Sequence, residues 1–432
     1  MNELRVMEIL TDWNFWGNFN SSFIERGDYL DLMESFLDEG QVLVVKGIRR
    51  AGKSALTYLL VEDLIKKGLL GKKDSLFINF EDPRFSSTLS SEDILKIYEI
   101  YLQKVGPSSN HLVVLDEVQN VVGWEKVARF FVENRGVKVI VTGSSSKLLS
   151  DEYSSVLSGR HLDVEVFPLS FKEFLNFKNL KITDEVSLMK NRVEIKRLFD
   201  EYLRFGGFPA VVLKNEKEEI LRGYFKDIII KDLVKRYSIK NISKIEELAK
   251  WYVNSISTLQ SYNKIRKYLK LNLDSVERYS RYLKTVKLLQ FVEKFSYSQK
   301  ARIISNRKVY VIDTGFFNVV SFKFSQNIGR LYENLVSIEL LRRNKSIFYW
   351  KSENNYEVDF IIRENNKNVQ LIQVCYDLTD PKTKERELRG LLKASDELSC
   401  DDLVVVTWDY EAKERVKDKE VSFVPLWKWL LS

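Results

Sequence analysis

The sequence predicts an α/β fold with a parallel sheet near its N-terminal end, and three observations predict it. The glycine-bounded loop 47–54 follows the apolar run 42–45 and precedes a helical pattern. A second apolar run, within 112–117, ends in two carboxylates, and a third, within 137–146, ends in small polar residues. Short continuous apolar runs are typical of strands buried on both faces of a parallel sheet.

The loop matches the pattern G-x-x-x-x-G-K-S in full, and its residue types suit a phosphate chain. Glycines let the backbone turn tightly, so that successive N–H groups point inward, and the following helix N-terminus adds partial positive charge. Lys53 can reach the β- and γ-phosphates, and the Ser54 hydroxyl can ligate Mg²⁺. A glycine-rich turn with a surface lysine is the alternative, which the strand–helix context disfavours. The predicted nucleotide contacts are Gly47, Ile48, Arg49, Arg50, Ala51, Gly52, Lys53, Ser54 and Ala55.

The two carboxylates lie where ligands collect in open α/β sheets, at the carboxyl end of a buried strand. We expect Asp116 to hold Mg²⁺ and Glu117 to orient and polarise the attacking water, which favours hydrolysis of the nucleotide. The alternative is a pair that caps the next helix. No N-K-x-D motif for reading guanine occurs, so ATP is favoured over GTP. The sequence therefore predicts an Mg²⁺-dependent ATPase with ATP and Mg²⁺ as cofactors.

Two further residues are candidates for the catalytic step. Ser144, with Thr142 in reserve, ends a strand expected beside the P-loop strand and can contact the γ-phosphate or the water as a sensor. Arg160 follows on a loop and can stabilise transition-state charge at a neighbouring subunit, which implies a homo-oligomer. An ordinary intramolecular salt bridge is the alternative for Arg160.

The composition limits which other structures and functions the chain can have. The 432 residues suggest two to four domains, with ordinary apolar content (44 % hydrophobic) and a net charge of only +7. Two cysteines and two histidines exclude a disulfide framework and a zinc site. Because the start is not a signal peptide and no apolar run approaches 18 residues, we expect a cytoplasmic protein without a membrane partner. The aromatic-rich residues 7–35 either pack against the purine or cover the sheet edge.

Several motifs in order carry a resemblance to a known family. They are Asp12-Trp13-Asn14-Phe15-Trp16, the loop 47–54, Leu-Asp-Glu-Val-Gln-Asn (115–120), Gly123-Trp124, Thr-Gly-Ser-Ser-Ser (142–146), Ser-Gly-Arg (158–160) and 168–174. Together they resemble the archaeal AAA-type ATPase family, found in archaea and some bacteria. The resemblance implies a P-loop ATPase core over 1–167 and a helical lid over 168–240. Gly206-Gly207-Phe208-Pro209 resembles the Gly-x-Pro element of signal-transduction ATPases, which would place Pro209 against the nucleotide and let Gly207 and Pro209 couple it to the lid. A turn that ends a helix is the alternative.

Residues 241–315 predict a winged-helix domain, with helices near 246–256, 263–269 and 275–289 and a hairpin over 291–311. The third helix is expected to begin with a cap at Asp274. Residues 262–308 hold 13 Lys and Arg against three acids, 13 − 3 = +10, which favours binding of double-stranded DNA. A packing domain with solvated lysines is the alternative. The expected DNA contacts are Arg278, Arg281 and Lys284 on the third helix and Lys300 and Arg302 in the wing.

Residues 316–432 resemble the restriction-endonuclease-like fold, an α/β fold whose helix Glu, strand Asp and Glu-x-Lys hold metal and water. Glu333 and Asp359 match that pattern, but Gln373 stands in place of the second strand carboxylate and Cys375 in place of the lysine. A neutral amide is a poor Mg²⁺ ligand, so we expect a catalytically degenerate relative of the nucleases.

The function that these observations favour is an ATP-binding and ATP-hydrolysing switch that couples its nucleotide state to DNA binding through the basic winged helix. One alternative is a signalling or scaffold ATPase that recruits proteins. A metal-dependent nuclease is less favoured.

Overall fold

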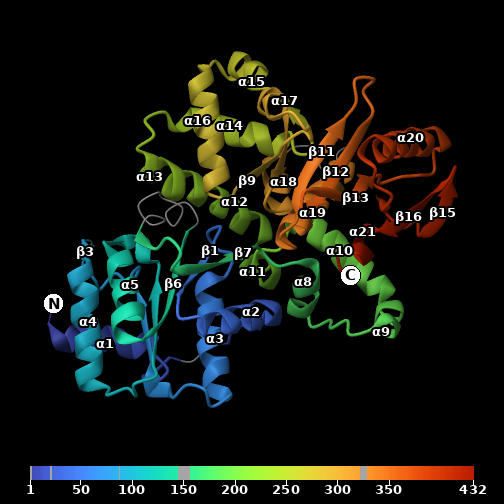
Figure 1. Cartoon of the computed structure of the whole chain (residues 1–432). Coiled ribbons are helices and arrows are strands. Elements are labelled where there is room, and N and C mark those ends of the chain that lie inside the picture. The colour runs from blue at the N-terminus through green and yellow to red at the C-terminus, as the bar shows by residue number, and fades with distance from the viewer. Residues whose placement is uncertain (1, 20–21, 87, 145–155, 322–327) are drawn as a thin grey trace. The chain divides into compact units, whose positions relative to one another are not determined.

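The computed structural model describes residues 2–19, 22–86, 88–144, 156–321 and 328–432. The chain divides into two compact units, Met1–Val166 and Phe167–Ser432, which are drawn in Figure 1 and described separately below. None of the helices within the described ranges is both long enough and apolar enough to cross a membrane.

The first unit is built on a five-stranded sheet whose order is β2-β4-β6-β1-β7. All neighbouring strands pair in parallel, which confirms the predicted parallel sheet. The P-loop strand β1 lies between β6 and β7, so the strand expected beside it is there. The strands are β1 (Val42–Gly47), β2 (Ser75–Asn79), β4 (Leu112–Asp116), β6 (Lys138–Ser144) and β7 (His161–Val166).

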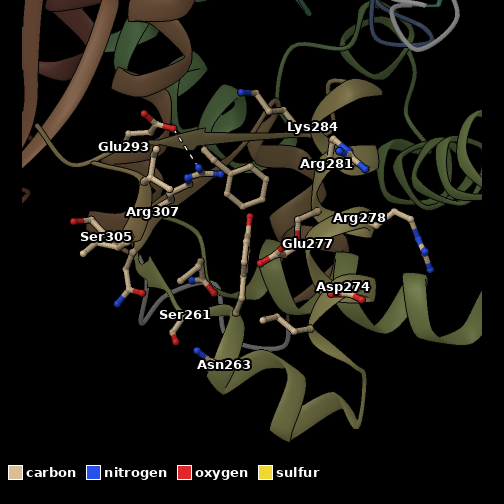
Figure 2. A pocket seen from close by; sticks show the side chains of 18 residues that line it. Ser261, Asn263, Asp274, Glu277, Arg278, Arg281, Lys284, Glu293, Ser305 and Arg307 are labelled. Carbon is tan, nitrogen blue, oxygen red and sulfur yellow. Dashed lines mark ion pairs between the residues drawn. The ribbon is translucent and has the colours of Figure 1, made fainter. Parts of the chain in front are cut away.

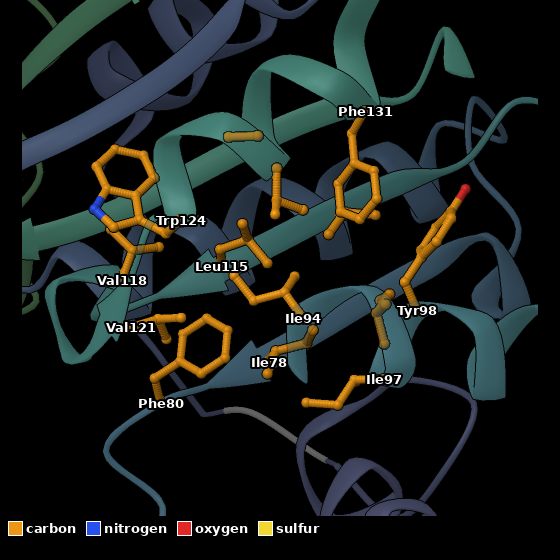
Figure 3. Close-up of a cluster of buried hydrophobic side chains, with 14 of the residues drawn as sticks. Ile78, Phe80, Ile94, Ile97, Tyr98, Leu115, Val118, Val121, Trp124 and Phe131 are labelled. Carbon is orange, nitrogen blue, oxygen red and sulfur yellow. The ribbon is translucent and has the colours of Figure 1, made fainter. Parts of the chain in front are cut away.

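Helices pack on the sheet because their apolar residues recur with helical spacing. In Figure 3 the side chains of β2 and β4 meet those of α4 and α5 in one buried cluster, which includes Ile78, Leu115, Ile94 and Phe131. Helix α4 begins with a capping box between Ser90 and Asp93. The helices and short elements are α1 (Glu3–Trp13), α2 (Gly27–Leu37), α3 (Lys53–Lys66), η1 (Lys72–Asp74), α4 (Ser91–Lys104), η2 (Val118–Asn120), α5 (Trp124–Arg135) and the paired β3 (Leu89–Ser90) and β5 (Val121–Val122).

The aromatic segment before β1 covers the free edge of β2. The Asn14 amide accepts from the backbone N–H of Phe77 (2.6 Å) and donates to its carbonyl (2.9 Å), as a neighbouring strand would. The Trp16 indole donates to the Ser75 carbonyl at 3.0 Å. Tyr58 of α3 stacks between Phe77 and Phe19, with ring centroids 3.8 and 4.0 Å away. Of the two roles expected for this segment, these contacts favour covering the sheet edge.

The second unit begins with a helical region, as the sequence predicts for 168–240. Helix α8 opens with a capping box between Ser170 and Glu173. α12, η3 and α13 follow one another without a break, and the middle part, Ile228–Val234, is a π-helix. The elements are α8 (Phe171–Phe177), α9 (Glu185–Lys190), α10 (Arg192–Phe205), α11 (Pro209–Leu213), α12 (Lys217–Asp227), η3 (Ile228–Val234) and α13 (Lys235–Tyr237).

The helices α14 to α18 and a three-stranded antiparallel sheet of order β8-β10-β9 follow. Two details of the prediction are wrong. Helix α16 is capped by Asn272, whose side chain accepts from the Ser275 N–H, and not by Asp274, which lies inside its first turn. The expected plain hairpin contains a short helix, α17. The elements are α14 (Ile242–Asn254), β8 (Leu259–Gln260), α15 (Tyr262–Leu269), α16 (Leu273–Thr285), β9 (Leu289–Val292), α17 (Gln299–Ile304), β10 (Arg307–Val311) and α18 (Thr314–Val320).

The chain ends in a mixed six-stranded sheet of order β11-β12-β13-β14-β16-β15. β11, β12 and β13 form an antiparallel meander, and α20 then crosses over to β14, which is parallel to β13. Apolar residues of α20 and the strands share one core. The elements are α19 (Ile328–Arg342), β11 (Ser346–Lys351), β12 (Glu357–Glu364), β13 (Lys367–Val374), α20 (Pro381–Leu398), β14 (Leu403–Thr407), β15 (Ala412–Val416), β16 (Lys419–Pro425) and α21 (Leu426–Trp429).

Candidate functional site

The P-loop connects the carboxyl end of β1 to the first turn of α3. Gly52 precedes the helix with φ +97°, a backbone conformation that glycine adopts at little cost. Gly47 passes close to β7, because a Cβ there would lie 2.2 Å from the Val166 carbonyl oxygen. The Lys53 side chain is buried, and its Nζ donates to the Ile48 carbonyl at 3.3 Å. The lysine ammonium therefore lies over the loop.

Asp116, at the end of β4, joins the P-loop to its neighbouring strand. Its Oδ1 accepts from the Ser54 hydroxyl at 2.8 Å and from the Thr142 hydroxyl. Burial raises the pKa of this carboxyl to about 7 and Glu117 adds to the rise, while the hydrogen bonds from Thr142 and Ser54 and the charge of Lys53 oppose it. A carboxylate beside a hydroxyl is an oxygen donor set that suits Mg²⁺, so the predicted ligands Ser54 and Asp116 fit that ion.

Glu117 follows in a left-handed conformation, with φ +55°. Its backbone N–H donates to the Thr142 hydroxyl at 3.1 Å, and its carboxylate accepts from the Gln119 amide. Thr142 therefore contacts both members of the acidic pair. The sequence predicts Ser144 as the sensor and Thr142 only as its reserve. Position along a strand does not show which of the two hydroxyls contacts the Asp116 carboxylate.

Ser144, the preferred sensor, lies directly beside Gly47 in the register of β6 with β1. It is buried at the end of β6, next to the first residue of the P-loop. These residues therefore lie together at the carboxyl end of the parallel sheet. They are Lys53, Ser54, Asp116, Glu117, Thr142 and Ser144. Residues 145 and 146, the last of the predicted small polar run, lie outside the described residues.

One P-loop contact was missed at the level of sequence. Arg26, immediately before α2, is buried, and its Nη1 donates to the Ala51 carbonyl at 3.0 Å. Its guanidinium also lies over the Tyr29 ring, 4.6 Å from the centroid. No motif marks this arginine, which stands in a segment distinguished by its aromatic residues.

Comparison with known proteins agrees with this geometry. Residues 39–175 match the family model described as an AAA domain, and residues 196–327 and 328–429 match two domains of unknown function, DUF8612 and DUF4143. Uncharacterized protein MJ1544 of Methanocaldococcus jannaschii is 38 % identical over 418 residues, which cover 93 % of this chain and 90 % of that protein. The chain belongs to the same family of AAA-domain proteins.

Two more proteins are similar to this chain. An uncharacterized protein of Haemophilus influenzae is 28 % identical over 94 % of this chain and 99 % of its own length. Among solved structures, the Walker-type ATPase paby2304 of Pyrococcus abyssi covers 69 % of this chain and 96 % of its own, at 14 % identity and a TM-score of 0.43. The AAA domain implies that this protein binds a nucleotide.

Arg160 lies at the opposite end of the sheet, where the parallel strands begin. Its carbonyl accepts from Val42, at the start of β1, whereas the P-loop follows the end of that strand. Its side chain pairs with Glu133 of α5, so the salt bridge weighed against a trans role is present. Action at a neighbouring subunit stays a prediction. Pro209 is the first residue of α11, and its contact with the nucleotide also stays a prediction.

A groove with a volume of about 890 Å³ lies between α16 and the segment that carries α17 (Figure 2). Arg278, Arg281 and Lys284 line its α16 side and are exposed. Acidic side chains line it too, and Arg307 pairs with Glu293 at 3.3 Å, the dashed line in Figure 2.

The basic count over 262–308 needs one correction. Lys308, one of the 13 cations counted in favour of DNA binding, has a side chain that is only 2 % exposed and is paired with three carboxylates. Lys300 is exposed on α17, and Arg302 is half-buried.

The residues that match the nuclease-like pattern also lie close together, but their side chains are a poor set of ligands for a metal ion. The Gln373 amide accepts from the Asp359 N–H (3.3 Å) and donates to Glu387 (2.7 Å), so it is committed to protein partners. The Cys375 thiol is buried and contacts the Asp377 carbonyl. Within the described ranges, no three His, Cys, Asp or Glu side chains are grouped to hold a metal ion. The residues present therefore do not fit the metal that the resemblance implies.

Proposed function

We propose that this protein is an Mg²⁺-dependent ATPase whose nucleotide state controls binding of double-stranded DNA. The observation that carries the ATPase part is the convergence on Asp116, which accepts from Ser54 of the P-loop and from Thr142 of β6 while Glu117 follows it. In support of the proposal, the P-loop, the two predicted ion ligands and the predicted water-orienting carboxylate all lie at the carboxyl end of the parallel sheet.

Each residue has one task in the proposed reaction. The P-loop N–H groups and Lys53 bind the β- and γ-phosphates, and Ser144 meets the γ-phosphate from the neighbouring strand. Ser54 and Asp116 would hold Mg²⁺, which when bound neutralises phosphate charge. Glu117 orients the attacking water, and Thr142 fixes Glu117 relative to Asp116. Closure of the helical region 168–240 would then carry the nucleotide state to the rest of the chain.

The ATPase proposal is tested with Glu117→Gln and Lys53→Ala. We expect Glu117→Gln to bind ATP but to lose at least about 100-fold in turnover, because the amide cannot polarise water as a carboxylate does. Lys53→Ala should weaken ATP binding itself. Glu125→Gln on α5 makes the same chemical change away from the site and should hydrolyse ATP at the wild-type rate. Wild-type turnover in Glu117→Gln would overturn the assignment.

From the exposed cations of α16 we infer that the nucleotide state controls binding of DNA. The order of helices and strands over 242–311 suits a winged helix, with α16 in the position of the recognition helix. Arg278, Arg281 and Lys284 are exposed along α16 and can meet phosphates or base edges. The alternative function, an ATPase that recruits proteins, assigns no role to these cations.

Fluorescence anisotropy with duplex DNA separates the two outputs. Binding is measured across a salt series without nucleotide, with ADP, and with ATP on Glu117→Gln. A steep salt slope that moves with the nucleotide supports DNA as the output. Arg278→Glu and Lys284→Glu should each weaken binding, whereas Lys181→Glu, an exposed lysine elsewhere, should not. Absence of binding in all three states would overturn the DNA part and direct the search to protein partners.

A further inference from the structure

The second unit contains a lysine that is buried among carboxylates. Nζ of Lys308, in β10, lies 2.7 Å from Asp359 Oδ1, 2.7 Å from Glu357 Oε1 and 3.0 Å from Glu333 Oε1. The Tyr310 hydroxyl donates to the same Glu333 oxygen at 2.7 Å. Two of these carboxylates, Glu333 and Asp359, are the residues that match the metal ligands of the nuclease-like pattern.

We propose that the Lys308 ammonium takes the place of a divalent cation in this carboxylate cluster. The C-terminal sheet thereby holds the β8-β10-β9 sheet in a fixed position without binding a metal ion. Lys308 supplies one buried positive charge where a metal would supply two, and its stem enters from β10, a strand of the neighbouring sheet.

The charge state of the cluster agrees with a resident cation. Three carboxylate oxygens lie within 3.0 Å of Nζ, and opposite charges at that distance favour the ammonium form of Lys308. An ammonium that contacts all three carboxylates leaves little of their negative charge for a divalent ion.

The surrounding contacts show that β10 is held at several points. Asn334, next to Glu333 on α19, accepts from the Val311 N–H and donates to its carbonyl, both at 2.8 Å. Beyond β9, the Phe295 N–H donates to the Tyr349 carbonyl at 2.7 Å, and the Tyr349 N–H donates to the Glu293 carbonyl at 3.1 Å. Backbone hydrogen bonds thus connect the segment after β9 to β11, and the ion pairs of Lys308 connect β10 to β12.

Removing one charge of a buried cluster costs far more than removing all of them, because the partners are left uncompensated. We therefore expect Lys308→Met to lower the Tm of the full chain by roughly 5–15 °C. The triple variant Lys308→Met, Glu333→Gln, Asp359→Asn should regain most of that loss. Lys300→Met, which removes an exposed lysine from the same segment, should leave the Tm unchanged.

Metal dependence is measured on the same proteins without nucleotide, so that the P-loop does not contribute. The wild-type Tm should be equal in EDTA and in millimolar Mg²⁺ or Mn²⁺. A wild-type Tm that rises with either ion, or a triple variant as unstable as Lys308→Met, would overturn the proposal. If Lys308→Met does not fold, the pair Glu333→Gln, Asp359→Asn takes its place, because it leaves Lys308 short of partners and should be less stable than the triple variant.

Discussion

Thr142 connects the two carboxylates that the proposed reaction needs. Its hydroxyl donates to Asp116 and accepts from the Glu117 N–H, so it fixes one acidic residue relative to the other. A valine of nearly the same shape would keep the packing of β6 and remove both hydrogen bonds. The hydroxyl orients other groups and does not itself react, so its loss should affect turnover more than binding.

We expect Thr142→Val to lower the kcat for ATP by about 10- to 100-fold while the Kd for ATP changes little. Steady-state hydrolysis and equilibrium nucleotide binding measure the two effects. Ser144→Ala, two residues further along the same strand, removes the proposed sensor hydroxyl but leaves both hydrogen bonds of Thr142 in place, so it separates the two effects. If Thr142→Val weakens ATP binding as much as it slows turnover, its hydroxyl maintains the binding loop and not the acidic pair.

Arg26 supports the P-loop from outside the motif. Its guanidinium donates to the carbonyl of Ala51, and the arginine is buried. Arg26→Met keeps much of the apolar stem but leaves that carbonyl without this donor, which costs about 1–3 kcal/mol when a group is buried. We expect nucleotide affinity to fall about 5- to 150-fold. Arg5→Met, on the exposed face of α1, is the control. Unchanged affinity in Arg26→Met would show that the P-loop keeps its conformation without the arginine.

Among the elements of the second unit, the Gly206–Pro209 turn is held on both sides. The Leu169 N–H donates to the Gly207 carbonyl at 2.7 Å, and the Gly207 N–H donates to the Asp313 carboxylate at 2.7 Å. A Cβ on Gly207 would lie 2.3 Å from the Leu169 carbonyl oxygen, a backbone atom that cannot move away easily. The turn therefore ties α8, α10 and α18 together through a position that only glycine fits.

We expect Gly207→Ala to lower the Tm by several degrees, because the extra methyl forces apart two hydrogen-bonded backbone segments. Gly223→Ala is the matched control. Gly223 lies inside α12, and a Cβ there would have nothing within 4 Å, so alanine should stabilise the helix slightly. Thermal unfolding of both variants decides the prediction, and equal Tm values would contradict it.

Asp313 should make this junction sensitive to pH. Burial raises its pKa to about 7, opposed by the Gly207 and Gly315 N–H groups and by Arg342. The folded chain then binds more protons than the unfolded chain between about pH 4 and 7, so this group's contribution to stability falls as the pH rises through that range. The Tm of the wild type relative to Asp313→Asn should therefore be higher at pH 5 than at pH 8. A constant difference would show that the carboxyl titrates normally.

The elements themselves could largely be predicted, because strand and helix patterns are local. The strand runs before Gly47, Glu117 and Ser144 and the capping box at Ser90 all follow from neighbouring residues. Lys308 could not be placed in this way. Its partners lie 25 to 51 positions away, so its burial is decided by tertiary packing, and in the sequence it counts as one more basic residue. Arg26 was missed for the same reason, since Ala51 lies 25 positions along the chain.

At the scale of the whole molecule, the proposed switch requires that ATP and DNA affect each other's binding equally. If ATP changes the affinity for DNA by some factor, DNA must change the affinity for ATP by the same factor, whatever path connects the two sites. Couplings of this kind usually fall between about 5- and 150-fold. This reciprocity separates a switch from a chain that merely carries two independent binding sites.

We expect Glu117→Gln, which binds ATP without consuming it, to bind ATP at least about fivefold more tightly or more weakly when duplex DNA is saturating. The DNA affinity of the same protein with and without ATP should shift by an equal factor and in the same direction. The Arg278→Glu, Glu117→Gln variant is the control, because weakened DNA binding should reduce the effect at a fixed DNA concentration while ATP binding without DNA stays unchanged. Affinities that stay constant in both directions would leave the ATPase and the basic helix uncoupled. The nucleotide would then have to control another surface of the chain.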